Sequence, residues 1–329
     1  MNLLLITGAP RSGTTGVGYN LALPRSAGLL YEPFNYRSGV REIERPFEIP
    51  GVGGFTEARL DDIVAGIRTL DLRMKSGRRG ADTPIKALAK RLIGGRSNLS
   101  YILCRLNPLL STIIWKDPMA VFTSREVALR LGITVLATVR PPAAVAASYT
   151  RLNWKPDVGA LIRCFQEKGW HVDIPAHDGE PNEASSAIKG AMIWTMVYRR
   201  LIAWSTETDR LHLINVQDIV DDPVGTYRDL YTLCGLPWSE RIEARIGKEY
   251  AQRADRDDHQ AERLPKTAHV KNRDLSRINE YGKRLLTQAE KDAVAAMTDS
   301  TWGELRAICD RHWARIRHRP PTAQPLVAS

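Results

Sequence analysis

The stretch "LLLITGAPRSGTTG" at residues 3–16 sets the fold of this chain. Residues 3–7 form a short apolar run, which is typical of a buried β-strand. Gly8 and Gly13 bound the loop that follows, and a helix is expected to begin at Thr14. The stretch therefore predicts a strand, a glycine-rich loop and a helix in direct succession.

The loop fits most of the phosphate-binding pattern G-x-x-x-x-G-K-[ST], with Gly8, Gly13 and Thr15 at the right spacing. Glycines let backbone N–H groups turn toward a phosphate, and the helix N-terminus adds partial positive charge. However, Thr14 stands where the lysine should be, and the cation of the loop is Arg11. In kinases that lysine reaches the phosphates at which charge develops. Its absence argues against a nucleotide kinase, which stays an alternative with a degenerate loop.

Further strands are expected at 29–31, 112–115 and 211–216, and the clearest is "ITVLATV" at 133–139. Helical segments separate these runs, for example the one after Arg140 with prolines in its first turn. Strands that alternate with helices predict an α/β fold with three layers, α/β/α, around a mostly parallel central sheet. Ligands of such sheets bind at the carboxyl ends of the strands.

We expect a single domain over residues 1–317 and a disordered, proline-containing tail at 318–329. Residues 36–110 are interpreted as an insertion on the substrate side of the sheet, with helical parts at 57–72 and 85–92.

The insertion contains a basic stretch. Between Arg73 and Arg105 the sequence has nine Lys or Arg residues and one acidic residue, Asp82. This stretch is either a solvated surface or a contact for an anionic substrate.

The net charge of +10 and the pI near 9.5 suit an anionic ligand, an acidic polymer, nucleic acid or an anionic membrane surface. The four cysteines have no zinc-binding spacing, and no metal site is expected. No apolar run approaches the roughly 20 residues of a membrane helix. We therefore expect a soluble, cytoplasmic protein, whose oligomeric state the sequence does not indicate.

Two motifs resemble those of the sulfotransferases that use 3′-phosphoadenosine 5′-phosphosulfate (PAPS). "GAPRSGTT" at 8–15 resembles that family's 5′-phosphosulfate loop, P-[KR]-[ST]-G-[ST]-[ST]. "VRPPAAVAASY" at 139–149 resembles its 3′-phosphate site, in which a serine follows an arginine by eight residues, here Arg140 and Ser148. The resemblance implies a P-loop-like fold, PAPS as the cofactor and a 3′-phosphate bound by these two residues. It implies a 5′-phosphate site made by Arg11, Ser12, Gly13, Thr14 and Thr15.

A weaker resemblance concerns "KTAHVKNRDLSRIN" at 266–279, which is similar to the loop that closes over the cofactor in this family. It implies that Lys271 and Arg273 contact the 3′-phosphate or the sulfonate. A solvated basic loop is the alternative interpretation.

The resemblance also suggests the general base. "IIWKDPMAVF" at 113–122 lacks the histidine of small-molecule sulfotransferases, whereas "LLYEPFNY" at 29–36 resembles the glutamate segment of carbohydrate sulfotransferases. Glu32 is therefore expected as the base, with Lys116 and Arg11 as further catalytic residues. Asp117 either orients Lys116 or serves as a rival base, and a strand-end ion pair is the structural alternative.

Taken together, the sequence predicts an enzyme that moves a sulfonate group in line from PAPS to a hydroxyl of a glycan, glycolipid or glycosylated metabolite. The expected partner is this hydroxyl-bearing acceptor, and no nucleic acid is expected. A kinase with a degenerate phosphate loop and a non-catalytic binder of an anionic polymer are the alternatives. The identity of the acceptor is not written in the sequence.

Overall fold

The structure of this chain is a computed structural model that describes residues 1–75, 95–172, 180–254 and 284–317. Lys271 and Arg273 lie outside the described residues. So do the predicted helix at 85–92, most of the basic stretch and the tail at 318–329.

Within the described residues, five strands form one parallel sheet in the order β2-β3-β1-β4-β5. The strands are β1 (Asn2–Thr7), β2 (Ala27–Tyr31), β3 (Thr112–Lys116), β4 (Thr134–Val139) and β5 (Leu211–Asn215). The register places Ile6 opposite Lys116, and Thr7 opposite Ala137. The central strands therefore end almost level, and the loops that follow them begin at one shared edge, the carboxyl edge.

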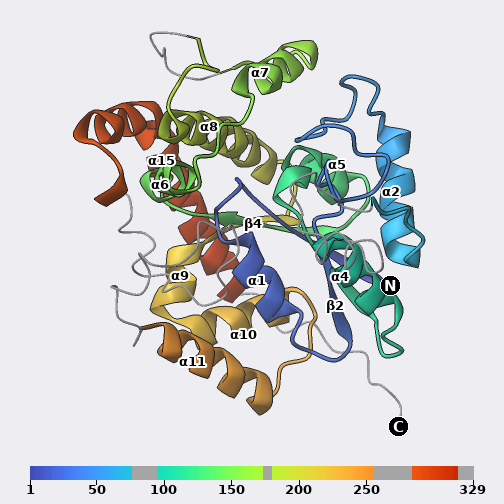
Figure 1. Cartoon of the computed structure of the whole chain (residues 1–329). Coiled ribbons are helices and arrows are strands. Elements are labelled where there is room, and N and C mark those ends of the chain that lie inside the picture. Colours follow the sequence, from blue (N-terminus) through green and yellow to red (C-terminus); the bar gives the residue numbers. More distant parts are fainter. Residues whose placement is uncertain (76–94, 173–179, 255–283, 318–329) are drawn as a thin grey trace, which may run out of the picture.

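Helices cover both faces of this sheet (Figure 1). They are α1 (Thr14–Leu21), α2 (Glu57–Thr69), α4 (Arg96–Arg105), the 3-10 helix η1 (Pro118–Thr123), α5 (Ser124–Leu129), α6 (Pro142–Leu152), α7 (Val158–Glu167), α8 (Ser186–Ser205), α9 (Val216–Asp221), α10 (Pro223–Leu233), α11 (Glu240–Ala254) and α15 (Gln288–Arg317).

Alternate residues of each strand enter different cores, as the pleat of a strand requires. Leu3 and Leu5 pack in a core with buried residues of α2, α5, α6, α7 and α8. Leu4 and Ile6 pack in a second core with residues of α1, α9, α10 and α11. Figure 1 shows α6, α7 and α8 on one side of the sheet and α10 and α11 on the other. The predicted three-layer α/β/α fold with a parallel sheet is confirmed.

Both edge strands are covered by a helix that satisfies an outward-facing N–H. The backbone N–H of Tyr31 in β2 donates to Ser100 Oγ of α4 at 2.8 Å. The N–H of Leu213 in β5 donates to His312 Nδ1 of α15 at 3.0 Å. Covered edges do not offer a template for pairing with another chain.

The described part of the segment 36–110 belongs to the main core. Val40, Phe55 and Leu60 are buried and pack in the same cluster as β1 and β3. Helix α4 was not among the predicted elements, because "IGGRSN" is typical of a loop. Its buried face consists of Ser97, Tyr101 and Cys104, whereas Leu99 and Leu103 are exposed, so no stripe of buried leucines marks the helix.

None of the helices within the described ranges is both long enough and apolar enough to cross a membrane.

Candidate functional site

Four segments of interest begin where a strand ends. Gly8 follows β1, Glu32 follows β2, Asp117 follows β3 and Arg140 follows β4. Because these strands are parallel and adjacent, the four segments start at the carboxyl edge of the sheet. The structure thus gathers there the site segments that were predicted separately from the sequence.

The loop after β1 depends on its two glycines. A Cβ at Gly8, where φ is 132°, would lie 2.4 Å from the carbonyl oxygen of Thr138 in β4. Gly13 has a φ of 100° and is the N-cap of α1, which has no side-chain capping hydrogen bond. Only glycine adopts such backbone angles without strain. The first turn of α1 therefore offers backbone N–H groups that can donate hydrogen bonds to an anion.

Arg11 of this loop contacts the second predicted phosphate motif directly. Its Nε donates to Ser148 Oγ of α6 at 2.9 Å. Arg140 Nη1 donates to the backbone oxygen of Arg11 at 3.1 Å. The two motifs, far apart in the sequence, thus form one cationic cluster at the carboxyl edge.

Ser12 and Thr138 join the loop to β4 in the interior. Ser12 Oγ and Thr138 Oγ1 are hydrogen-bonded at 2.8 Å, and Thr138 Oγ1 donates to the carbonyl oxygen of Thr7 at 3.2 Å. The side chain of Ser12 is buried and contributes to the shape of the loop. Sequence reasoning assigned Ser12 a backbone role and did not identify Thr138.

Two aromatic residues of α8 hold the end of β4. Trp194 Nε1 donates to the carbonyl oxygen of Arg140 at 2.9 Å, and Tyr198 Oη donates to that of Thr138 at 2.7 Å. Both side chains are fully buried. No sequence signal linked α8 to Arg140.

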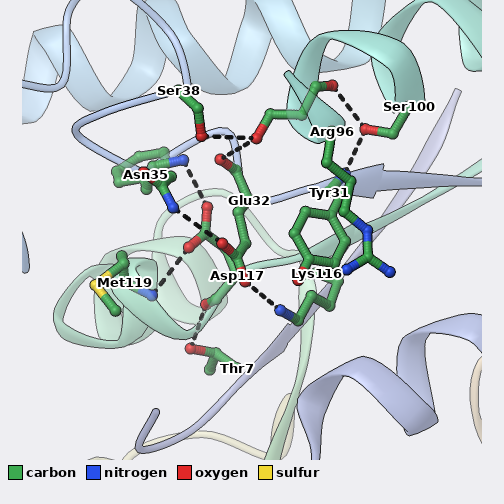
Figure 2. Close-up of polar contacts among 12 residues, drawn as sticks. Thr7, Tyr31, Glu32, Asn35, Ser38, Arg96, Ser100, Lys116, Asp117 and Met119 are labelled. Carbon is green, nitrogen blue, oxygen red and sulfur yellow. Dashed lines mark hydrogen bonds and ion pairs between the residues drawn. The ribbon is translucent and has the colours of Figure 1, made fainter. Parts of the chain in front are cut away.

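An ion pair between Glu32 and Lys116 occupies the β2–β3 side of the carboxyl edge (Figure 2). Lys116 Nζ lies 2.5 Å from Glu32 Oε1, and the side chains are 2% and 15% exposed, respectively. Burial by itself lowers the pKa of Lys116, but the attraction of Glu32 outweighs it, so this pKa lies above its usual value. Lys116 is therefore charged at neutral pH.

Asp117 lies beside this pair and accepts two backbone hydrogen bonds. Phe34 N donates to Oδ2 at 2.5 Å, and Met119 N donates to Oδ1 at 2.9 Å. The side chain is fully buried, and burial together with the negative charge of Glu32 raises the pKa of Asp117 to about 7. Figure 2 shows its carboxylate under the turn that follows Glu32.

Tyr31 connects the ion pair with the loop after β1. Its ring centroid lies 4.3 Å from Lys116 Nζ, and burial raises the pKa of its hydroxyl while Lys116 and Thr15 act in the opposite direction. On α4, the Arg96 guanidinium lies 4.2 Å from the same ring and donates to Tyr19 Oη at 2.6 Å. Neither tyrosine was predicted to belong to the site, and Arg96 was counted only as part of the basic stretch.

The described part of the chain contains no group of three or more His, Cys, Asp or Glu side chains that would hold a metal ion. Arg11, Arg140 and Ser148 form one side of the candidate site, and Glu32, Lys116 and Asp117 form the other. Lys271 and Arg273 lie outside the described residues.

No protein-family model matches this chain, and no curated protein matches it either. Several solved structures are similar. The sulfotransferase domain of the olefin synthase from Synechococcus PCC 7002 is 16% identical with a TM-score of 0.46, over 93% of this chain and 94% of that chain.

The sulfotransferase domain from the curacin biosynthetic pathway is 14% identical with a TM-score of 0.47, over 91% of this chain and 97% of that chain. A sulfotransferase from Mycobacterium avium is 15% identical with a TM-score of 0.40, over 91% of this chain and 76% of that chain.

Proposed function

We propose that this chain is a sulfotransferase that uses PAPS. The observation that carries this proposal is the contact of Arg11 with Ser148 and Arg140, which joins two phosphate-site motifs beside the Glu32–Lys116 pair. A nucleotide with phosphates at both ends and an acceptor hydroxyl need these two kinds of site next to each other.

The residues present fit such a donor. Gly8 and Gly13 give the loop its positive-φ turns, where a Cβ would contact Thr138 or Val216, and the N-terminus of α1 supplies backbone donors for a 5′-phosphate. Arg11 would add charge to that site, with the hydroxyls of Thr14 and Thr15.

The second phosphate has its own residues. Arg140 at the end of β4 and Ser148 two turns into α6 would bind the 3′-phosphate, because a guanidinium and a hydroxyl both donate to phosphate oxygens. Lys271 and Arg273 are proposed, from the sequence resemblance, to complete this site.

The bound donor would supply an activated sulfonate group. Glu32 would act as the general base that takes the proton of the acceptor hydroxyl. Lys116 keeps Glu32 ionised and thus ready for a proton. Once Glu32 gains that proton, its attraction for Lys116 weakens, and the ammonium can stabilise the negative charge that builds up on the leaving group. Arg11 would stabilise the same charge from the other side.

The acceptor is proposed to be a hydroxyl of a glycan, glycolipid or glycosylated metabolite. This rests on the similarity of the Glu32-Pro33-Phe34 and Lys116-Asp117-Pro118 segments to carbohydrate sulfotransferases. A buried carboxylate beside an ammonium suits an acceptor whose hydroxyl is not acidic, such as a sugar hydroxyl, since this proton needs a base.

Thermal unfolding with adenosine 3′,5′-bisphosphate, the product of the donor, tests the proposal, with ADP and magnesium in parallel. A ligand at 100 times its dissociation constant stabilises the folded state by about 2.7 kcal/mol. We expect stabilisation by the bisphosphate that Arg140→Ala reduces and that the exposed surface variant Arg125→Ala retains. Stabilisation by ADP with magnesium alone would contradict the proposal and favour a kinase with a degenerate phosphate loop.

A further inference from the structure

Glu32 has a backbone conformation that residues other than glycine rarely adopt. Its φ is 48°, in the left-handed region. Such a conformation costs about 1–3 kcal/mol and persists only where the surroundings enforce it. Here its own N–H donates to the carbonyl oxygen of Lys116 at 2.8 Å, and its carbonyl oxygen accepts from Asn35 N at 3.1 Å.

The carboxylate of Glu32 is held at both oxygens. Oε1 contacts Lys116 Nζ, and Oε2 accepts a hydrogen bond from Asn35 Nδ2 at 3.0 Å (Figure 2). The amide of Asn35 is itself oriented, because its Oδ1 accepts from Arg37 N at 3.1 Å. The amide therefore directs its donor toward Glu32.

Asp117 secures the turn that carries these groups. Its Oδ2 accepts from the N–H of Phe34, which lies between Glu32 and Asn35 in the sequence, and its Oδ1 accepts from Met119 N. A fully buried carboxylate is costly unless hydrogen bonds compensate it. Here the two backbone hydrogen bonds offset part of that cost, and they fix the 32–35 turn to the start of η1.

We propose that Asn35 and Asp117 are positioning residues for Glu32. Asn35 orients the carboxylate through Oε2, and Asp117 fixes the turn that holds Glu32 in its left-handed conformation. The inference rests on the proposed function, in which Glu32 is the base. An acceptor hydroxyl then meets a carboxylate whose direction is set before binding, as efficient proton transfer requires. Asp117 is fully buried and both of its oxygens bind backbone N–H groups, so its place suits holding the turn rather than meeting an acceptor.

Carbon-13 NMR of the Glu32 carboxyl group tests the role of Asn35 without any acceptor, with the resonance assigned from Glu32→Gln. The titratable and charged groups around Glu32 are Lys116, Asp117 and Tyr31, with Arg96 beyond the Tyr31 ring. Changes at position 35 leave all of these in place.

We expect Asn35→Ala to raise the titration midpoint of Glu32, because a donor to the charged form is lost. Asn35→Asp should raise it further by adding a like charge, and Asn35→Gln should restore part of the shift. An unchanged midpoint in a folded Asn35→Ala variant overturns the role of Asn35.

Kinetics test both residues, with sulfonate transfer from PAPS to octyl β-D-glucoside as the reaction. Asn35→Ala and Asp117→Asn should each lower kcat about tenfold and leave the KM for PAPS within about twofold, since the carboxylate loses its alignment and the donor site is untouched. Asn182→Ala is the matched control, because it breaks an amide–carboxylate hydrogen bond with Asp157 at an exposed position.

The outcomes separate this inference from the proposed function. Full activity of Glu32→Gln would contradict the base assignment, whereas loss of activity there with normal kcat in Asn35→Ala and Asp117→Asn overturns the positioning role. If Asp117→Asn does not fold, the Asn35 series decides, by kinetics or by the NMR titration.

Discussion

The two sides of the candidate site are built in different ways. The phosphate half consists of Gly8–Thr15, Arg140 and Ser148, and it uses backbone N–H groups, glycine angles and guanidinium groups at the ends of β1 and β4. The carboxylate half consists of Glu32, Lys116 and Asp117, and it uses a buried ion pair and a strained turn at the ends of β2 and β3. The first is suited to hold an anion, and the second is suited to move a proton.

This difference predicts a separation of effects. Changes in the phosphate half should weaken donor binding, whereas changes in the carboxylate half should slow the reaction and leave donor binding intact. Tyr31 links the two halves, because its ring lies against Lys116 and Thr15 influences the pKa of its hydroxyl. The separation is therefore expected to be strong but not complete.

The largest effect is expected for Glu32→Gln. The substitution keeps the size of the side chain but removes the base, so kcat should fall about 100- to 10,000-fold. The affinity for adenosine 3′,5′-bisphosphate should stay within about twofold. Steady-state kinetics and isothermal titration calorimetry measure the two quantities.

Glu207→Gln is the control for this change. Glu207 is an exposed carboxylate that pairs with Arg125 before the start of β5, at the opposite edge of the sheet. It should change neither quantity, because exposed ion pairs contribute little. Loss of bisphosphate affinity in Glu32→Gln would show that the two halves are not separate.

Arg140→Ala should have the second-largest effect. A hydrogen bond to a charged group contributes about 1.5–3 kcal/mol, so the dissociation constant for the bisphosphate should rise about 10- to 100-fold. The kcat at saturating PAPS should change much less. Calorimetry on the variant and on Arg125→Ala measures this, and an equal loss in both would point to nonspecific charge.

Asp117 should make stability depend on pH. Its pKa is about 7 in the folded protein and about 3.9 in an unfolded chain, so the folded state binds more protons between these values. The contribution of Asp117 to the free energy of unfolding is therefore present at low pH and is lost as the pH rises toward 7.

Urea unfolding at pH 5 and pH 7 measures this dependence. Relative to Asp117→Asn, which does not titrate, the wild-type protein should lose about 2 kcal/mol between the two pH values. If the free energies of unfolding of the wild type and Asp117→Asn differ by the same amount at both pH values, Asp117 stays ionised throughout. Its two backbone hydrogen bonds would then outweigh the effect of burial on its pKa.

Local sequence signals predicted the fold class and the glycine loop after β1, whereas Arg140 and Ser148 were selected by resemblance. A buried parallel strand is a continuous apolar run, and β1 and β4 carry such runs directly before their site residues. Gly8 and Gly13 made the loop recognisable in the sequence, because only glycine adopts their backbone angles without strain. Helix α4 was missed because two of its leucines face solvent. Its hydrogen bond to β2 comes from a serine hydroxyl, which no apolar pattern reveals.

The carboxylate half was only partly predictable. Glu32 and Lys116 were selected by resemblance, but their pairing depends on the register of β2 and β3, which no local pattern specifies. Asn35 and Tyr31 gave no signal, since an amide and a tyrosine near a strand end are ordinary residues. Their roles follow from side-chain directions that only the assembled sheet determines.

The smallest predicted effect compares two glycines of one helix. Gly13→Ala places a Cβ 3.0 Å from Val216 at a φ of 100°. The free energy of unfolding of this variant should therefore be about 1–2 kcal/mol lower than that of the wild-type protein. The variant should also bind the bisphosphate more weakly. A Cβ at Gly16 meets no atom within 4 Å, so Gly16→Ala should be up to about 1 kcal/mol more stable, because alanine favours helix. Its affinity for the bisphosphate should not change.

Thermal unfolding with and without the bisphosphate measures both variants. If Gly13→Ala binds the bisphosphate normally, side chains rather than backbone N–H groups hold the anion, and the phosphate half works by charge alone.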